Sequence, residues 1–455
     1  MHPFFKSLLI TCHAAALCLS AARAEQPNFI IILSDDQGYN DLGCFGSPNI
    51  KTPNIDQMAK EGRKFTSFYV PSPVCSPSRA GLLTGCYPKR IGMEKHVLFP
   101  KDNKGLHPEE VTIADMLKAR GYATACIGKW HVGHRKPFLP TNQGFDSYYG
   151  IPYSNDMVHP DNKGKYRGSQ DKLWLNQDEM VKLWNTPLMQ DEEIIELPVN
   201  QRTITRRYTD KAIEFITANK EKPFFLYLPH SMPHIPLFVP EDAYDPDPKN
   251  AYKAVIEHID AEVGRVVDTV KQLGLSENTY IIYTSDNGPW LWFKNHGGKA
   301  DPLREGKGTT YEGGQRVPCV MWAPGRIPAG TETDAIASTI DLLPTLAQLT
   351  GSPAKTRGEI DGTDISPLLL GTEKSVRDEF LFYTSNGKLE GLRQGDWKLL
   401  MKKGKAELFN LAKDIGEQQN QAKEMPEKVS HLLNRMRKLD EQINHQIRPQ
   451  GKIAG

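Results

Sequence analysis

The sequence is poor in cysteine, has almost no net charge, and lacks internal repeats and low-complexity tracts. Seven cysteines in 455 residues are too few for a fold held together by disulfides. The 56 basic and 55 acidic side chains nearly cancel, which argues against a general binder of nucleic acids or membrane surfaces. A hydrophobic fraction of 39% is still enough for a sizeable core, so the composition indicates an ordinary globular protein.

The chain also lacks an apolar run long enough to span a membrane, but a shorter run lies at its N-terminus. Lys6 precedes this mostly apolar stretch, residues 8–19. Ala22-Arg23-Ala24 then matches the A-x-A pattern of a cleavage site, which a buried N-terminal helix would not explain. We therefore expect residues 1–24 to be a signal peptide, no membrane span, and a periplasmic or secreted protein.

Removal of the signal peptide would leave an odd number of cysteines. The five that remain are Cys44, Cys75, Cys86, Cys126 and Cys319. In an exported chain, an odd count indicates that one thiol is unpaired or modified. Whether the others form disulfides stays open.

Four short apolar runs each end in polar residues. These runs cover residues 29–33, 122–127, 224–228 and 280–283. Continuous apolar runs of this length predict strands buried on both faces of a mostly parallel sheet. Between them lie helical patterns at 112–120, 255–273 and 339–349. The alternation predicts an α/β sandwich with helices on both faces of the sheet, in which ligands bind at the carboxyl ends of the strands.

Two other regions have different patterns. The segment from Gly150 to Gln201 is polar and weakly periodic, and predicts a long loop or insertion over the site. After Arg377, short apolar stretches separated by Gly turns predict strands at 379–383, 397–401 and 407–411, followed by a polar helix at 426–444. We therefore expect a large α/β domain over residues 25–376. A small C-terminal α+β subdomain, an antiparallel sheet with a helix, would cover residues 377–455.

Acidic pairs follow two of the predicted strands, Asp35-Asp36 after the first and Asp286-Asn287 after the last. Their side chains are hard oxygen ligands that suit calcium or magnesium. Acids brought together at strand ends would repel each other unless a cation or basic groups lay beside them. Either pair alone could instead belong to a turn or a helix cap, so the metal-site hypothesis depends on cationic partners elsewhere in the chain.

A cysteine motif begins at Cys75, with the sequence Cys-Ser-Pro-Ser-Arg followed by Ala-Gly-Leu-Leu-Thr-Gly up to Gly85. Taken alone, it could mark a buried cysteine packed beside a helix. The motif resembles the signature of the formylglycine-dependent (type I) sulfatases, in the arylsulfatase A and N-acetylgalactosamine-6-sulfatase group of the alkaline phosphatase superfamily. Four more segments resemble that family in the same order: Gly-Lys-Trp-His at 128–131, Gly-Ile-Pro-Tyr-Ser at 150–154, Pro-His-Ile-Pro at 233–236, and Gly-Lys-Gly-Thr-Thr-Tyr-Glu-Gly-Gly at 306–314.

The resemblance implies an alkaline-phosphatase-like fold, with a catalytic domain over residues 25–376, and hydrolysis of sulfate esters. A formylglycine-generating maturation enzyme would convert Cys75 to formylglycine (3-oxoalanine), whose hydrate supplies the attacking hydroxyl. The implied ligands of one calcium ion are Asp35, Asp36, residue 75, Asp286 and Asn287. The implied catalytic residues are Cys75, Arg79, Lys129, His131, His234 and Lys307. The implied substrate-binding residues are Lys129, Ser154, His234 and Lys307.

The roles implied for these residues follow from charge. The three cations, Arg79, Lys129 and Lys307, would stabilise the sulfate group. His131 would accept a proton as sulfate is expelled, and His234 would protonate the leaving oxygen. Taken one at a time, such lysines could be solvated, such histidines could serve only as structural hydrogen-bond partners, and Ser154 could be a turn serine.

The implied substrates are sulfated sugars or polysaccharides, together with aryl sulfates. Trp290 and Trp292 could stack on a sugar ring, or could pack their own loop. The polar side chains that could meet hydroxyl or acidic groups of a substrate are Asp156, His159 and His296. His230, close to His234 in the sequence, is a weaker candidate for a direct role.

Two alternative functions are compatible with the same motifs. One is a phosphonate or phosphate ester hydrolase of the same superfamily, which the lysine motifs and residues 150–154 disfavour. The other is a non-catalytic, calcium-dependent glycan-binding relative. Such a protein would be expected to have lost Cys75, Arg79 or a metal ligand, and all of these are present.

Overall fold

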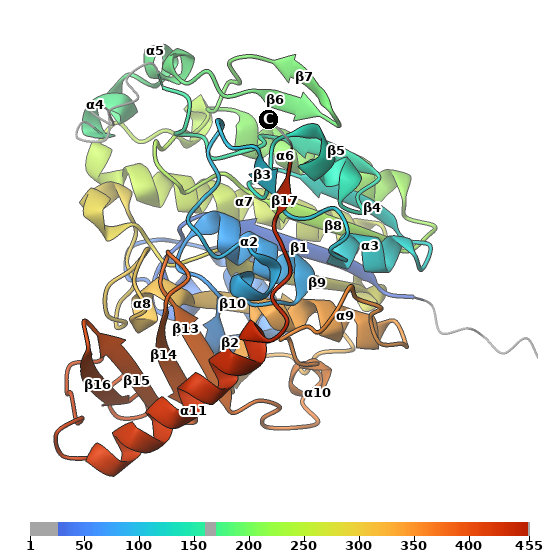
Figure 1. Cartoon of the computed structure of the whole chain (residues 1–455). Coiled ribbons are helices and arrows are strands. Elements are labelled where there is room, and N and C mark those ends of the chain that lie inside the picture. The colour runs from blue at the N-terminus through green and yellow to red at the C-terminus, as the bar shows by residue number, and fades with distance from the viewer. Residues whose placement is uncertain (1–25, 160–169, 454–455) are drawn as a thin grey trace, which may run out of the picture.

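A mixed sheet runs through the centre of the protein between two layers of helices (Figure 1). The computed structural model describes residues 26–159 and 170–453, so the expected signal peptide at 1–24 lies outside the described residues. The strand order is β11-β2-β10-β9-β1-β8-β4-β5-β6-β7, with β12 beside β2. The strands of this sheet are β1 (Asn28–Ser34), β2 (Arg63–Tyr69), β4 (Ala123–Ile127), β5 (Ser147–Gly150), β6 (Leu188–Gln190), β7 (Glu193–Glu196), β8 (Phe224–Pro229), β9 (Thr279–Ser285), β10 (Arg316–Trp322), β11 (Thr331–Thr333) and β12 (Ala337–Ser338).

The central strand β1 shows why the predicted strands are apolar throughout. β1 pairs in parallel with β8 on one side and β9 on the other, and β8 pairs in parallel with β4. Ile30 and Ile32 pack into one core with helices α6 and α7, whereas Phe29 and Ile31 pack into a second core with α2, α3 and α9. Both faces of the strand are therefore buried, and the predicted α/β sandwich with a mostly parallel sheet is confirmed.

The three predicted helices are present with small shifts at their ends. α3 (Ile113–Lys118) begins after Thr112, which forms a capping box with Asp115. α7 (Ala251–Gln272) ends shortly before Gly274, whose φ of 71° suits a helix C-terminus. The third corresponds to a 3₁₀ turn, η11 (Thr339–Asp341), continued by α9 (Leu342–Leu349). The other helices outside the C-terminal region are α1 (Pro53–Glu61), α2 (Cys75–Thr84), α4 (Gln170–Leu175), α5 (Gln177–Met180), α6 (Ile204–Ala218), α8 (Glu312–Gln315) and α10 (Ser366–Leu369).

The prediction of a long loop between Gly150 and Gln201 is wrong over much of that segment. The helices α4 and α5 lie in it, and the hairpin β6–β7 extends the central sheet antiparallel to β5. β7 is mostly exposed, and its sequence Glu-Ile-Ile-Glu is too short to produce a recognisable alternation. The hairpin forms because β6 pairs with the edge strand β5, a contact that the local sequence did not indicate.

The C-terminal region is a four-stranded antiparallel sheet covered by one long helix, as predicted. Its strands are β13 (Glu379–Tyr383), β14 (Leu389–Gln394), β15 (Trp397–Lys402) and β16 (Lys405–Asn410), and its helix is α11 (Pro426–Asn444). β14 was not predicted. Gly391 interrupts its apolar pattern, and a Cβ there would lie 2.4 Å from Leu400, so packing against β15 requires the residue that weakens the signal.

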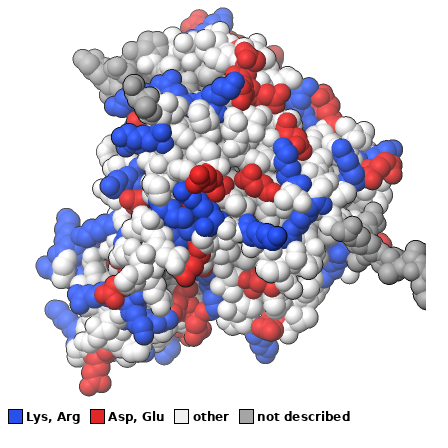
Figure 2. Space-filling view, turned by 45° about the vertical axis from the view of Figure 1, so that its right-hand side comes forward, with Lys and Arg blue, Asp and Glu red and all other residues white. Residues whose placement is uncertain are grey.

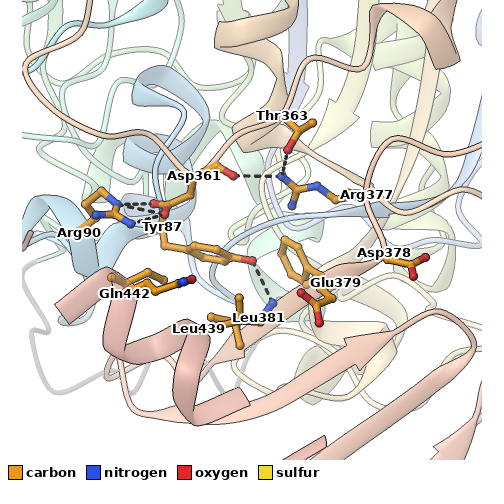
Figure 3. A pocket seen from close by; sticks show the side chains of 12 residues that line it. Tyr87, Arg90, Asp361, Thr363, Arg377, Asp378, Glu379, Leu381, Leu439 and Gln442 are labelled. Atoms are coloured by element: carbon orange, nitrogen blue, oxygen red, sulfur yellow. Dashed lines mark hydrogen bonds and ion pairs between the residues drawn. The ribbon is translucent and has the colours of Figure 1, made fainter. Parts of the chain in front are cut away.

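The C-terminal sheet shares a hydrophobic core with the rest of the protein. Tyr69, Tyr87 and Ile340 pack into the same cluster as Phe380 of β13. A cavity of about 350 Å³ lies beside this contact, lined by Tyr87, Arg377 and residues of α11 (Figure 3). The last strand, β17 (Gly451–Lys452), returns across the molecule to pair with β3 (Lys104–Gly105). The boundary between residues 376 and 377 therefore stays a prediction.

Thiols and surface charges in the described part agree with the composition. Cys44, Cys75, Cys86, Cys126 and Cys319 are all free. Basic and acidic side chains alternate over the face shown in Figure 2, as a near-zero net charge leads one to expect. No helix within residues 26–159 or 170–453 has the length and hydrophobicity needed to cross a membrane.

Candidate active site

The carboxyl ends of the central parallel strands bring most of the predicted site residues to one edge of the sheet. β4, β8, β1 and β9 lie side by side and run in the same direction. The residues that follow these strands are Asp35, Asp36, Lys129, His131, His234, Asp286 and Asn287. Strand direction alone thus gathers seven side chains that are widely separated in the sequence.

The antiparallel strand β10 brings two further segments to this edge, those that contain Cys75 and Lys307. β10 pairs antiparallel with both β9 and β2, so β2 runs parallel to β9 and its end at Tyr69 reaches the same edge. α2 begins six residues later, at Cys75. β10 itself begins at this edge, and Lys307 lies in the segment that leads into it. Cys75 and Lys307 therefore lie at the same edge of the sheet as the polar residues that follow the parallel strands.

Cys75 lies at the centre of the site, at the first position of α2. Its side chain is buried, with Sγ 3.5 Å from Oδ1 of Asp35, 4.0 Å from Oδ1 of Asp36 and 3.8 Å from Nζ of Lys307. The helix N-terminus adds partial positive charge at this position. Burial nevertheless raises the pKa of the Cys75 thiol well above its ordinary value, so an unmodified cysteine here is a poor thiolate nucleophile.

Two buried cations join the strands beneath Cys75. Arg79, one turn further along α2, donates from Nε to Oδ2 of Asp286 at 2.9 Å and from a terminal nitrogen to the carbonyl of Lys129 at 2.6 Å. Nζ of Lys129 donates to Oδ2 of Asp35 and to Oγ of Ser154, the latter at 3.2 Å. Both side chains are fully buried, so they are fixed charges in the site and are not solvated surface groups.

Lys307 is the third cation of the site. Its Nζ lies 2.7 Å from Oδ2 of Asp36 and 4.3 Å from the centroid of the Trp290 ring. Although burial alone would lower the pKa of Lys307, the carboxylate of Asp36 raises it above the ordinary value for lysine. Lys307 is therefore charged at neutral pH and positioned beside residue 75.

The acidic residues have the arrangement expected of a metal site. Ligand atoms of Asp35, Asp36, Cys75 and Asp286 all lie within 4.8 Å of one another and are buried. Burial raises the pKa values of Asp36 and Asp286, and the charge of Asp35 adds to the effect on Asp286. Asn287 donates to Asp36 at 2.7 Å, and its own buried Oδ1 has no hydrogen-bond partner among the described residues. These hard oxygen donors fit a divalent cation, whose charge would relieve the crowding of the carboxylates.

Each histidine of the site is oriented by a main-chain carbonyl. Nε2 of His131 lies 3.0 Å from the carbonyl of Leu98, so Nε2 carries the proton. The buried Nδ1 is left as an acceptor, and the part of the chain that the structure describes offers it no partner. Nδ1 of His234 lies 2.6 Å from the carbonyl of Ile235, which leaves its Nε2 directed at Oδ2 of Asp36, 3.6 Å away. Burial and the neighbouring lysines lower the pKa of both imidazoles well below the ordinary value.

The backbone is held in an unusual conformation at two of these positions. Asp36 and His131 have φ values of 63° and 62°, in the left-handed region that non-glycine residues rarely adopt. Gly128 has a φ of 139°, and a Cβ there would lie 1.9 Å from the carbonyl oxygen of Pro229. Such strain is characteristic of positions where the fold dictates the direction of a side chain.

The weaker sequence candidates have mixed outcomes. Trp290 contacts the site through Lys307 and through the ring of His234, 5.5 Å away, whereas the Trp292 side chain is 81% exposed. His296 is buried and bonded to Asp171 at 2.7 Å, which favours a structural role. The ring of His159 packs at 4.7 Å from that of Trp184, and Asp156 is buried. His230 is fully buried, and its ring lies 6.4 Å from that of Tyr208.

Sequence reasoning missed the groups that orient the histidines. The carbonyls of Leu98 and Ile235 determine which ring nitrogen of His131 and His234 faces the site. Every residue has a carbonyl, so no residue type could have indicated these two positions. Only the folded backbone identifies them.

Buried cations, a cluster of acids suited to a metal and a residue at a helix N-terminus, all at the carboxyl edge of an α/β sheet, define the class of hydrolases that act on anionic esters. Residues 27–352 match the family described as Sulfatase, and the chain belongs to that family. It is a sulfatase and hydrolyses sulfate esters. Residues 306–445 also match the family described as N-sulphoglucosamine sulphohydrolase, C-terminal.

Individual relatives agree with this assignment. The chain is 42% identical to arylsulfatase A of Homo sapiens over 374 residues, which are 81% of this chain and 73% of the relative. It is 36% identical to N-acetylgalactosamine-6-sulfatase of Canis lupus familiaris over 411 residues, 86% of this chain and 74% of the relative. These similarities confirm the expected type of sulfatase.

Solved structures confirm the expected fold. The PsFucS1 sulfatase from Pseudoalteromonas sp. superposes with a TM-score of 0.82 at 27% identity, covering 94% of this chain and 92% of that one. The complex of Ps i-CgsB with k-i-k-neocarrahexaose gives a TM-score of 0.79 at 32% identity, covering 91% and 93%. The alkaline-phosphatase-like α/β sandwich inferred from the sequence is thus the fold of this chain.

Proposed function

We propose that this sulfatase acts through a formylglycine made from Cys75 and with one calcium ion, on sulfated sugars or polysaccharides and on aryl sulfates. The observation that carries the proposal is the position of residue 75. It is buried at a helix N-terminus, between the carboxylates of Asp35 and Asp36 and the ammonium group of Lys307. A cysteine so placed has a raised thiol pKa, whereas a hydrated aldehyde at the same position would present hydroxyl groups to the sulfur of an ester.

The cations around residue 75 bind the sulfate group. Lys307, with Nζ 3.8 Å from Sγ of Cys75, and Lys129 would hold two oxygens of the sulfate, and Ser154, which is bonded to Lys129, would be a further hydrogen-bond partner. Arg79 is paired with Asp286 and stabilises negative charge at residue 75. Because Arg79 and Lys129 are fully buried and the Lys307 side chain is only 10% exposed, their field is little screened by water where charge develops in the transition state.

The calcium site comprises Asp35, Asp36, Asp286, Asn287 and residue 75. The unpartnered Oδ1 of Asn287 and the raised pKa values of two of the acids support a cation at this position. When bound, the ion would supply positive charge that lowers the pKa of a hydroxyl at residue 75 and polarises a sulfate oxygen.

The two histidines move protons. His131 is neutral at pH 7 because its pKa is lowered, and its free Nδ1 is available to accept the proton released when sulfate leaves. His234 delivers a proton from Nε2 to the leaving oxygen. Burial and the positive charges of Lys307 and Lys129 lower the pKa of His234. A bound anionic ester would offset the charge of Lys307 and so raise this pKa, which means that the role of His234 as an acid depends on bound substrate.

The substrate, partner and location follow from the same similarities. A sulfated glycan suits a site that has the ring of Trp290 beside Lys307 and His234, and the maturation enzyme is the partner that the Cys75 motif requires. We further propose that the catalytic domain covers residues 25–376, that residues 377–455 form the subdomain, and that the signal peptide at 1–24 directs the protein to the periplasm or out of the cell.

The test is mass spectrometry of the peptide containing Cys75, from protein made in a host with the maturation enzyme. We expect the mass loss of thiol conversion to aldehyde or its hydrate, while the peptide with Cys319, a buried free thiol, keeps its mass. The Cys75→Ala variant should release sulfate from an aryl sulfate at least about a thousandfold more slowly than the parent enzyme. Its unfolding temperature should stay within a few degrees of the wild-type value. An unmodified Cys75 in active protein would refute the proposed nucleophile. Faster turnover of an aryl phosphonate than of the aryl sulfate would refute the substrate class.

A further inference from the structure

A second cavity, of about 570 Å³, lies beside the candidate active site. Four lysines line it, Lys249, Lys253, Lys294 and Lys299, and we call it the basic hollow. They come from three segments: η8 (Pro248–Asn250), the first turn of α7, and the stretch from η10 (Leu291–His296) to Lys299. Its size is in the range of cavities that bind small ligands.

The lysines of the basic hollow are not neutralised by the protein. Within the described residues, none of their ammonium groups lies within 4.0 Å of a carboxylate, although many other lysines of the chain form such pairs. Lys249, Lys294 and Lys299 are exposed and Lys253 is half-buried. Mutually repelling charges left without partners on one cavity wall favour the binding of an anion.

The acids near the basic hollow are engaged elsewhere. Asp41, which lines it, accepts hydrogen bonds from the main-chain nitrogens of Gly38 and Lys299 and from the Tyr252 hydroxyl, at 2.7 to 3.2 Å. Asp245 accepts from the side chain of Asn250, and Asp247 from the main-chain nitrogen of Lys249. These contacts hold the carboxylates against the backbone and leave the ammonium groups available.

Two short segments connect the basic hollow to the active site. Leu291 lines the hollow, and the preceding residue, Trp290, contacts Lys307 and His234 in the site. On the other wall, Asp41 follows the site residue Asp36 by five positions and is bonded to Gly38. A chain of sugar rings with one ring at residue 75 would therefore extend past Trp290 into the hollow.

We propose that the basic hollow is a subsite for a second sulfate group, carried by a neighbouring sugar of the chain whose sulfate ester lies in the active site. The inference rests on the proposed action on sulfated carbohydrates. Four ammonium groups on flexible stems suit a sulfate, a compact anion that accepts hydrogen bonds in several directions. The enzyme would then bind an oligosaccharide with two or more sulfate groups more tightly than a monosulfated compound.

The test compares two double variants in a Cys75→Ala background, which prevents turnover during binding. One is Lys253→Gln with Lys294→Gln. The matched control is Lys60→Gln with Lys405→Gln, two exposed lysines outside the hollow. The probes are hexasaccharides of carrageenan, heparin and chondroitin sulfate. Each is titrated by calorimetry at low salt and in about 0.5 M sodium chloride, a concentration at which interactions between surface charges are largely screened.

We expect the hollow variant to bind the best probe about tenfold more weakly than the control, because one exposed and one half-buried charge contact are lost. The difference should shrink in high salt, and Lys253→Arg with Lys294→Arg should restore affinity, which a merely structural role would not produce. Equal affinity of the hollow and control variants would overturn the proposal, and so would failure of the parent protein to bind any probe.

Sulfate release separates this inference from the proposed function. Matured enzyme that releases sulfate from an aryl sulfate, but whose affinity for the probes does not depend on the hollow lysines, contradicts only the subsite. Lysine-dependent binding without sulfate release from any probe or from the aryl ester contradicts the proposed function and leaves the anion-binding hollow in place.

Discussion

At the scale of single residues, the site works through charges that the protein has buried. Lys129, Arg79 and Lys307 would each be costly to bury alone, but each is paired with an acid, Asp35, Asp286 and Asp36 respectively. A substrate and the proposed calcium ion would therefore enter a site whose charges are already positioned. Little reorganisation is needed when negative charge develops during the reaction.

His234 provides the sharpest test of a single role. We expect His234→Ala to reduce kcat/KM by about 10²- to 10⁴-fold for alkyl or sugar sulfates and by much less for activated aryl sulfates, because good leaving groups need little protonation. The measurement is kcat/KM for a series of aryl sulfates against the pKa of the leaving phenol. The variant should give a steeper line than the parent enzyme. Parallel lines would show that His234 does not act as the general acid.

His230 predicts a pH dependence of stability. Burial, with a smaller effect of His258, lowers its pKa to about 3, and neither ring nitrogen has a hydrogen-bond partner. The unfolded chain, with a histidine pKa of about 6.5, binds more protons between pH 6.5 and 3. The free energy of unfolding should therefore be highest above pH 6.5 and fall as the pH decreases, by up to about 1.4 kcal/mol per pH unit from this group.

The measurement is urea unfolding of His230→Phe from pH 7 to pH 4. We expect the free energy of unfolding of this variant to fall less steeply with decreasing pH than that of the parent protein. The difference between the two slopes should correspond to close to one proton. His445→Phe, at an exposed position after α11, serves as the control and should keep the parent slope. Equal slopes for all three proteins would mean that His230 is not buried as a neutral group.

At the scale of helices and strands, local signals set where elements begin, and packing sets which of them form. Thr112 and Asp115 cap α3 reciprocally, and the sequence pattern there predicted the helix. β6 and β7 have no comparable signal, and their pairing with the sheet edge determines their conformation. The insertion between residues 150 and 201 is for this reason the part of the fold least readable from the sequence.

Thr112→Ala tests the capping box. We expect a loss of about 1 kcal/mol in the free energy of unfolding, because the main-chain nitrogen of Asp115 loses its acceptor. Thr203→Ala is the matched control, since Thr203 occupies the N-cap position of α6 without a capping hydrogen bond. It should cost less than half as much in the same denaturation experiment. Equal losses would mean that the capping bond contributes nothing measurable.

At the scale of the whole molecule, a buried ion cluster joins the C-terminal sheet to the rest of the protein. Lys398 of β15 lies 2.8 Å from Glu312 of α8 and 2.9 Å from Glu417, and all three are fully buried. Although burial opposes ionisation, Lys398 and Arg316 lower the pKa of Glu312 to about 2, whereas burial raises that of Glu417 to about 7. The two carboxylates thus share Lys398, which comes from the C-terminal sheet, and Glu312 is also paired with Arg316 at 3.1 Å.

We expect Lys398→Met to destabilise the protein by about 3–5 kcal/mol at pH 8, because two buried carboxylates lose their shared cation. Glu417 has a raised pKa in the folded state, so its protonation below pH 7 favours folding. The loss should therefore be smaller at pH 5. Thermal and urea unfolding at both values provide the measurement, with Lys405→Met, at an exposed position on the neighbouring strand, as the control. A loss that grew as the pH decreased would contradict this account of the cluster.

The sequence by itself determined the central parallel strands, several of the helices and the motifs, because these depend on patterns within a few residues. Apolar runs buried on both faces predicted β1, β4, β8 and β9, and the acids and basic groups after them were identified from residue type. The antiparallel C-terminal sheet and α11 were readable for the same reason. Gly391 in β14 was not, because its role is to make room for Leu400 of another strand.

Only the tertiary structure decided how these parts act together. The direction of β10 brings Cys75 and Lys307 to the edge where the parallel strands end, and the carbonyls of Leu98 and Ile235 select the free nitrogen of each histidine. The basic hollow is assembled from lysines up to 50 residues apart, Lys249 to Lys299, none of which stands out locally. A site depends on distances between segments that are remote in the chain, and no local pattern contains those distances.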